Sequence, residues 1–139
     1  MPKKNKSNES TDLISKLISK EMVSYIIVNN DLNMSKGKIA SQVAHGILDV
    51  HRFLLSKNIS HDQWSNNGEK IVVVKTGQSN ILNIYRQFQD QIPEKNTFNV
   101  FPIYDAGRTE VATGSLTILA CTPISSDKVP DEIKILKLL

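Results

Sequence analysis

The fold is decided by residues 25–55, which read YIIVNNDLNMSKGKIASQVAHGILDVHRFLL. The first four residues are apolar and predict a strand, and residues 29–34 predict a polar turn. Ser35 predicts the N-cap of a long helix that ends near Lys57. At about 100° per residue, the apolar side chains of this helix share one face, which has to be buried. These side chains are Ile39, Val43, Ile47, Val50 and Leu54.

A second stripe of side chains runs along the same helix, beside the face that has to be buried. Its members all carry groups that can take part in chemistry, and the helical spacing keeps them in one line. They are Lys38, Gln42, His45 and Asp49. A stripe in this position can form one wall of a functional site.

Strands and helices alternate through the rest of the chain. The expected elements are a strand at 70–75 covered on both faces, a helix ending near residue 91, strands at 98–104 and 116–121, and a short helix from about 127 to 136. Pro102 places the third strand at a sheet edge or next to a bulge. The fold class is α/β, and the expected architecture is a three-layer α/β/α sandwich around a four-stranded mixed sheet. We expect this sheet to be mostly parallel, and the direction of its last strand stays open.

The length of 139 residues suits one domain with its own core. Residues 1–20 hold five lysines against two acidic residues and predict a flexible basic extension, with a short helix at 11–20 as an option. Residues 21–139 form the expected domain, in which basic and acidic residues balance. If this domain binds a nucleic acid, it does so through a local patch.

The single cysteine, Cys121, excludes an internal disulfide and a multi-cysteine metal site. It lies in an apolar strand, where a core role is expected. We therefore expect a cytoplasmic protein with no cofactor, no metal and no membrane segment.

Three polar segments follow the first three expected strands, at residues 29–38, 75–79 and 105–109. In an open α/β sheet, ligands gather at the carboxyl ends of the parallel strands, so these segments predict a site at one rim. Lys36 and Lys38 strengthen the prediction. A cation in the first helical turn opposes the helix dipole at some cost in stability, and a helix with this cost is often positioned to bind a phosphate or an oxyanion. The plainer alternatives are solvated lysines at the helix start and a helix-face histidine at His45.

Three separated blocks of the sequence resemble the type-two peptidyl-tRNA hydrolases of archaea and eukaryotes. The first block is NDLNMSKGKIASQVAHG at residues 30–46, the second is DAGRTEVATGS at 105–115, and the third is the closing LKLL at 136–139. The resemblance covers residues from about 22 to 139. It implies a mixed sheet between helices and an enzyme that cleaves the ester bond between a peptide and the 3′ end of tRNA.

The resemblance also implies site residues. By motif position, the residues that match catalytic ones are Lys38, Asp105, Thr109 and Thr117. The candidates for binding substrate are Asp31, Lys36, Gln42, His45 and Arg108. In this scheme Asp105 orients the attacking water and Lys38 stabilises the oxyanion, without a covalent intermediate.

The partner implied is peptidyl-tRNA, held by its RNA backbone and 3′ end. A homodimer is left open. The sequence departs from the family at Asn29, where an arginine is usual. A non-catalytic RNA-binding or adaptor module on the same fold is therefore the alternative function.

Overall fold

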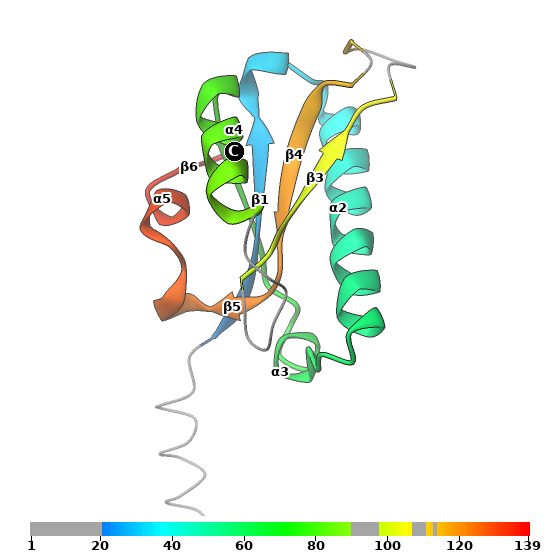
Figure 1. Ribbon diagram of the computed structural model, residues 1–139, viewed down its shortest axis with the longest axis vertical. Coiled ribbons are helices and arrows are strands. Elements are labelled where there is room, and N and C mark those ends of the chain that lie inside the picture. Colours follow the sequence, from blue (N-terminus) through cyan, green and yellow to red (C-terminus); the bar gives the residue numbers. More distant parts are fainter. Residues whose placement is uncertain (1–20, 90–97, 107–110, 113) are drawn as a thin grey trace, which may run out of the picture.

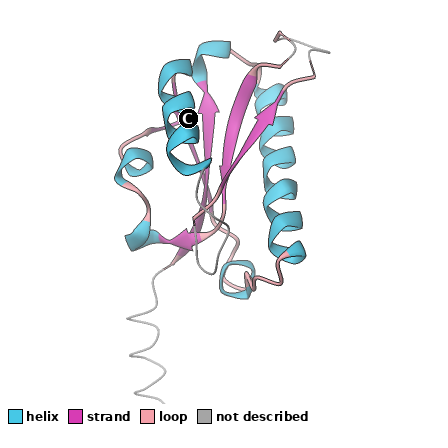
Figure 2. Cartoon of the chain, viewed as in Figure 1, coloured by secondary structure: helices cyan, strands magenta, loops and turns pink. Residues whose placement is uncertain are grey.

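The computed structural model describes residues 21–89, 98–106, 111–112 and 114–139. The strands are β1 (Met22–Asn29), β2 (Ile71–Thr76), β3 (Val100–Tyr104), β4 (Leu116–Cys121), β5 (Ile124–Ser125) and β6 (Lys137–Leu138). The helices are η1 (Asn30–Leu32), α2 (Lys36–Ser56), α3 (Asp62–Ser65), α4 (Gln78–Gln89), η2 (Ser126–Lys128) and α5 (Asp131–Lys134). Figures 1 and 2 show the sheet running up the molecule, with α2 on one side and α4 on the other. Among the described helices, none combines the length and the apolar character needed to cross a bilayer.

The six described strands form a mixed sheet in the order β3-β4-β1-β2-β6, with β5 paired to the start of β1. Only β1 and β2 pair in parallel among these strands, and the other pairs are antiparallel. The expectation of a mostly parallel, four-stranded sheet is therefore wrong. The chain between β3 and β4 has no crossover helix in its described part, and β4 returns antiparallel to β3. Two short strands, β5 and β6, join the sheet near the C-terminal end.

The three strands that were expected to form the rim still end at the same side of the sheet. Since β3 is antiparallel to β4 and β4 is antiparallel to β1, β3 runs in the same direction as β1 and β2. Asn29, Thr76 and Tyr104 therefore end their strands at the same side of the sheet. In Figure 1 the labelled strands β1 and β3 both point toward the top. Pro102 lies in an edge strand with a register shift after Ile103, as its presence predicted.

The two faces of the sheet carry separate apolar clusters. On one face, Ile26, Ile118 and Ala120 pack with the apolar stripe of α2, including Val50 and Leu54. On the other face, side chains such as Ile27 and Leu119 pack with Ile81, Ile84 and Phe88 of α4. Burying apolar area on both faces is the main stabilising contribution in a fold of this size.

Helix α2 begins where the sequence predicts, because the Ser35 side chain accepts a hydrogen bond from Lys38 N at 3.2 Å. In its middle, Gly46 lies against β4. A Cβ on this glycine would stand 2.8 Å from Ala120 Cβ and 2.8 Å from Ile118 Cδ1. Gly46 therefore allows the helix to approach the sheet closely enough for its polar stripe to meet the rim.

Two further expectations are wrong in detail. Strand β2 is not covered on both faces, since Ile71 is 41% exposed and Val74 is its one buried residue. It lies beyond the strands that α2 covers, near the sheet edge. In place of the expected helix from 127 to 136, the structure has the two short helices η2 and α5, because Val129 and Pro130 between them adopt extended backbone. Helix α3, which anchors the buried Trp64, was not anticipated.

Candidate active site

Lys38 and Asp105 meet at the rim, although 67 positions separate them in the chain. Lys38 comes from the first turn of α2 and Asp105 directly follows β3. The ammonium group donates to the Asp105 carboxylate, and only 13% of the Lys38 side chain and 4% of the Asp105 side chain are exposed. Asp105 is fixed through its backbone as well, since its N–H donates to Ser115 O at 2.9 Å and its carbonyl accepts from Gly114 N at 2.8 Å. The result is a well-positioned, mostly buried ion pair.

Gln42 and Thr117 form a second contact, one helical turn below Lys38. Gln42 Nε2 donates to Thr117 Oγ1 at 2.8 Å, and Thr117 Oγ1 donates to the Ile103 carbonyl at 2.9 Å. A hydroxyl carries a single proton, so Thr117 can only accept from Gln42. This fixes the orientation of the Gln42 amide, with its NH2 group on Thr117. Thr117 itself is fully buried.

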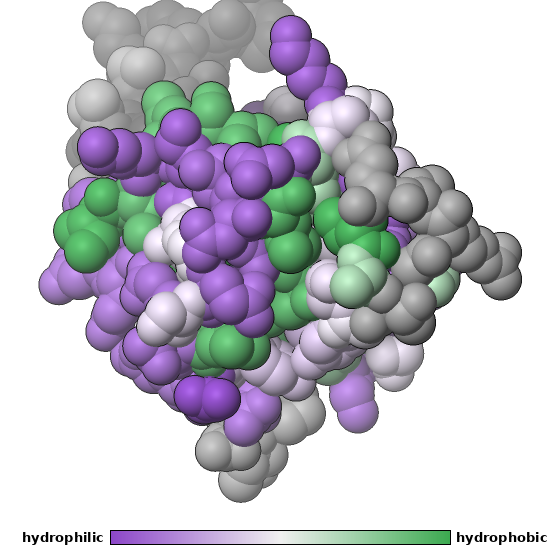
Figure 3. Space-filling view, turned by 90° about the horizontal axis from the view of Figure 1, so that it is seen from above, coloured by the Kyte–Doolittle hydropathy of each residue, from purple (hydrophilic) through white to green (hydrophobic). Residues whose placement is uncertain are grey.

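These side chains line a groove of about 560 Å³ between α2 and the end of β3. The whole polar stripe expected from the helical spacing is in its wall: Lys38, Gln42, His45 and Asp49. His45 is exposed, and Asp49 forms an ion pair with Arg52 at 3.3 Å. Figure 3 shows the rim from above, where hydrophilic residues cover most of the central surface.

Asp31 lies at the same rim but contacts the other helix. Its Oδ2 accepts a hydrogen bond from Gln78 N at 2.7 Å, so it caps the N-terminus of α4. Asn29 holds the same helix end and loop. Its Nδ2 donates to Gln78 Oε1 and to Leu116 O, the latter at 2.9 Å. Its Oδ1 accepts from Asp31 N at 3.2 Å. Asn29 is fully buried. Asn29, at the position where the sequence departs from the family it resembles, therefore makes its hydrogen bonds to other parts of this protein.

The remaining predicted site residues divide into two groups. Lys36 is exposed on the first turn of α2, next to the rim. Thr109 and Arg108 lie outside the described residues, so the structure does not place them.

Sequence reasoning missed the Asn29–Asp31–Gln78 network and the Ile103 carbonyl. The polar residue Asn29 at the end of an apolar strand was the one available signal for the network.

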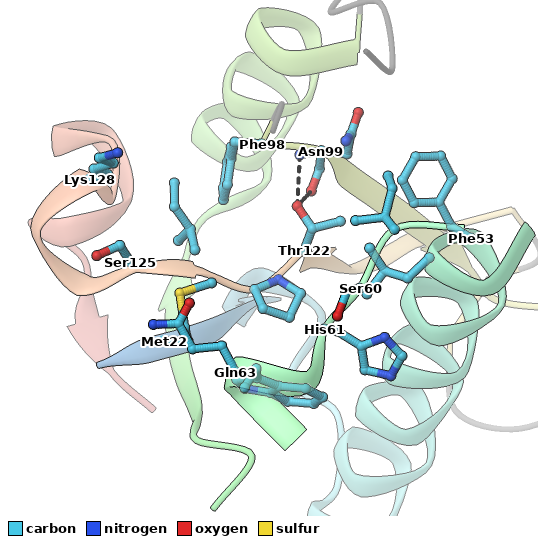
Figure 4. Close-up of a pocket in the computed structure, with 15 residues that line it drawn as sticks. Met22, Phe53, Ser60, His61, Gln63, Phe98, Asn99, Thr122, Ser125 and Lys128 are labelled. Atoms are coloured by element: carbon cyan, nitrogen blue, oxygen red, sulfur yellow. Dashed lines mark hydrogen bonds between the residues drawn. The ribbon is translucent and has the colours of Figure 1, made fainter. Parts of the chain in front are cut away.

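A second pocket, of about 460 Å³, lies at the opposite end of the sheet (Figure 4). Phe53, Phe98 and Met22 contribute apolar surface, and the polar residues include His61. The Thr122 hydroxyl accepts from Asn99 N at 3.0 Å and is thus engaged within the protein. This pocket contains none of the predicted site residues.

Cys121 is fully buried in β4, and burial raises the pKa of its thiol far above the ordinary range. A thiolate nucleophile is therefore excluded at this position. Within the described ranges, no three histidine, cysteine or acidic side chains gather in a way that could hold a metal ion.

Comparison with known proteins places this chain among relatives of one family. The sequence matches the family profile described as Peptidyl-tRNA hydrolase PTH2 over residues 22–139. A peptidyl-tRNA hydrolase of Methanococcus vannielii is 36% identical over 119 residues, covering 82% of this chain and 96% of the relative. Human peptidyl-tRNA hydrolase 2, mitochondrial, is 32% identical over 134 residues, covering 93% of this chain and 73% of the relative. The chain therefore belongs to the PTH2 family of peptidyl-tRNA hydrolases.

Proposed function

We propose that this protein hydrolyses the ester bond between the peptide and the tRNA of peptidyl-tRNA, and that the Lys38–Asp105 pair carries the reaction. The function rests on the family and on relatives that are named as peptidyl-tRNA hydrolases. The observation that supports this site is the mostly buried ion pair between α2 and the end of β3, in the wall of an open groove. None of the relatives' names favours the adaptor alternative.

Asp105 orients a water molecule and accepts its proton as the water oxygen attacks the ester carbon. Lys38 stabilises the oxyanion that forms. An ammonium group has three N–H donors, so Lys38 can keep one on Asp105 and direct another at the oxyanion. The bond to the ribose oxygen then breaks, and the proton held by Asp105 passes to that leaving oxygen.

Gln42 and Thr117 divide their roles in this scheme. Gln42 presents its amide oxygen to the groove, because its NH2 group is committed to Thr117. Thr117 is a positioning residue that acts through Gln42, since its only hydroxyl proton goes to Ile103 O. For Asp31, its contact with Gln78 N favours a role in holding α4 at the rim over direct contact with substrate. Thr109 stays a catalytic candidate, and Lys36, His45 and Arg108 stay candidates for binding tRNA and peptide.

The broader setting is part of the same proposal. The α2 and α4 clusters on opposite faces of the sheet support a three-layer α/β/α arrangement. The archaeal relatives support a role in cytoplasmic translation, although the human relative is named as mitochondrial. A homodimer stays a prediction, as does a separate N-terminal extension at residues 1–20.

The direct experiment is cleavage of peptidyl-tRNA by the pure protein, with Lys38→Ala and Asp105→Asn compared with wild type. Each variant should lower kcat on the order of a hundredfold or more while KM changes little, because each group acts mainly in the transition state. The double variant should be much less impaired than the product of the single effects, since both groups serve one step.

Lys57→Ala is the matched control, because Lys57 is an exposed lysine at the other end of α2. It should leave kcat near the wild-type value. Near-normal turnover by folded Asp105→Asn would refute the assignment of roles. Binding of peptidyl-tRNA without any cleavage by wild type would favour the adaptor alternative.

A further inference from the structure

Tyr104 is an exposed aromatic residue directly beside the catalytic pair. It is 53% exposed, whereas Asp105, the next residue, is 6% exposed. Atoms of Tyr104 also line the groove that contains Lys38. A large aromatic ring that is open to solvent one residue from the reacting groups is available to a ligand bound there.

The two neighbouring side chains point to opposite faces of the sheet, as consecutive residues in extended backbone do. Asp105 contacts Lys38 of α2. Tyr104 contacts Tyr85 of α4, and partial burial, followed by the nearby Tyr85 hydroxyl, raises the pKa of the Tyr104 phenol. Tyr85 in turn packs against the apolar cluster on the α4 face. The Tyr104 ring is thus neutral and held from one side.

The chemistry of the substrate places a nucleobase near this ring. The ester is attached to the ribose of the 3′-terminal nucleotide, so the base of that nucleotide is only one sugar away from the bond to be broken. The 3′ end of tRNA is single-stranded, and unpaired bases are commonly held by stacking on aromatic side chains. When the ester carbon lies beside the Lys38–Asp105 pair, the base therefore lies one sugar away from this pair.

Two of the residues that line the groove carry aromatic rings, Tyr104 and His45. His45 is seven residues beyond Lys38 on α2, which is roughly 10 Å along the helix. Tyr104 is joined directly to Asp105, and one residue of strand spans only about 3.3 Å. Along the backbone, Tyr104 is therefore the aromatic residue closer to the reacting groups, and His45 lies further along the groove.

We propose that Tyr104 is the stacking platform for the base of the 3′-terminal nucleotide of peptidyl-tRNA, with Tyr85 holding its ring in place. The proposal rests on the proposed function, because the reacting ester defines where the base must lie. It adds a binding residue on the α4 side of the sheet to a site whose catalytic pair lies on the α2 side.

The test measures binding of a short RNA that carries a non-cleavable amide-linked peptide at its 3′ end, and cleavage of intact peptidyl-tRNA, for the same variants. Tyr104→Leu should weaken binding and raise KM about tenfold, in the range expected for the loss of one base–aromatic stack. Tyr104→Phe should keep most of the affinity, because the ring face remains. Leu55→Ala removes a similarly exposed large side chain (58%) at the far end of α2 and is the matched control.

A second substrate, in which the 3′-terminal nucleotide lacks its base, separates stacking from a structural effect. Wild type and Tyr104→Leu should bind this abasic substrate equally, since there is no base left to stack. A Tyr104→Leu penalty that persists on the abasic substrate, or a base-dependent loss in His45→Ala but not in Tyr104→Leu, would overturn the proposal. Because binding of the non-cleavable RNA does not require turnover, failure here is distinct from failure of wild type to cleave peptidyl-tRNA.

Discussion

At the scale of single residues, the hydrogen-bond chain from Gln42 to Thr117 to Ile103 decides what each group can still do. The hydroxyl proton of Thr117 is committed, because Thr117 has one to give and gives it to the Ile103 carbonyl, so it can only accept from Gln42. The amide orientation of Gln42 follows from that count. A hydroxyl that matches a catalytic position in the family pattern is thereby better suited to positioning a neighbour than to touching substrate.

Thr117→Val should lower kcat and also cost about 1–3 kcal/mol of stability, because the buried Ile103 carbonyl and Gln42 NH2 lose their partner. Thr117→Ser keeps the hydroxyl and should retain most of the activity. Kinetics in a Gln42→Leu background give the decisive comparison: if Thr117 acts through Gln42, Thr117→Val should lower kcat little further there. Full multiplication of the two effects would indicate that Thr117 acts directly.

At the scale of secondary-structure elements, the contact between α2 and β4 sets the depth of the site. Lys38 and Gln42 can reach Asp105 and Thr117 because Gly46 brings the helix close to Ala120 and Ile118. A helix held further from the sheet would leave the polar stripe facing solvent. The glycine thus contributes to the site without having any functional group.

Gly46→Ala should destabilise the protein by about 1–3 kcal/mol, because the added Cβ would overlap Ala120. Gly37→Ala in the same helix has nothing within 4 Å of the added Cβ and should be neutral or stabilising by up to about 1 kcal/mol. Thermal unfolding of both variants measures the difference. A midpoint for Gly46→Ala at or above that of Gly37→Ala would show that the helix has room to shift.

At the scale of the whole molecule, the charge distribution limits how tRNA can be attracted. The full chain carries a net charge of +3, and the excess comes from residues 1–20. Residues 21–139 carry equal numbers of basic and acidic residues, so under the proposed function we expect attraction for phosphates to come from individual lysines near the rim, such as Lys36. Such attraction is local and is screened by salt over roughly 10 Å at 0.1 M.

The affinity for tRNA should therefore fall steeply as the salt concentration rises. Lys36→Gln should make this dependence shallower. For one lost phosphate contact, the slope of log affinity against log salt should change by roughly 0.7–0.9. The kcat of Lys36→Gln should change little. Binding titrations between low and moderate salt test this, with Lys57→Gln at the far end of α2 as the control. Equal slopes for Lys36→Gln and wild type would remove Lys36 from the phosphate contacts.

Much of this could be predicted from the sequence, because it follows from local chemistry. Ser35 caps α2, the helical period places Lys38, Gln42, His45 and Asp49 in one stripe, and Pro102 marks an edge strand. These features need only a few neighbouring residues. The family could also be recognised from short contiguous blocks of sequence, and the match to the family profile over residues 22–139 confirms the family.

Tertiary structure alone decided the direction of β4, the shortening of the last helix and the exposure of β2, since each depends on what packs alongside. It also decided which site side chains are already engaged. The sequence placed Asn29 and Asp31 at the rim, and the family resemblance named Thr117 as a site residue. Only long-range contacts turn Asn29 and Asp31 toward α4 and commit the Thr117 proton to Ile103. The spacing of residues along a chain fixes which side chains share a face, whereas the partner of each hydrogen bond depends on strands and helices that the chain brings together from far away.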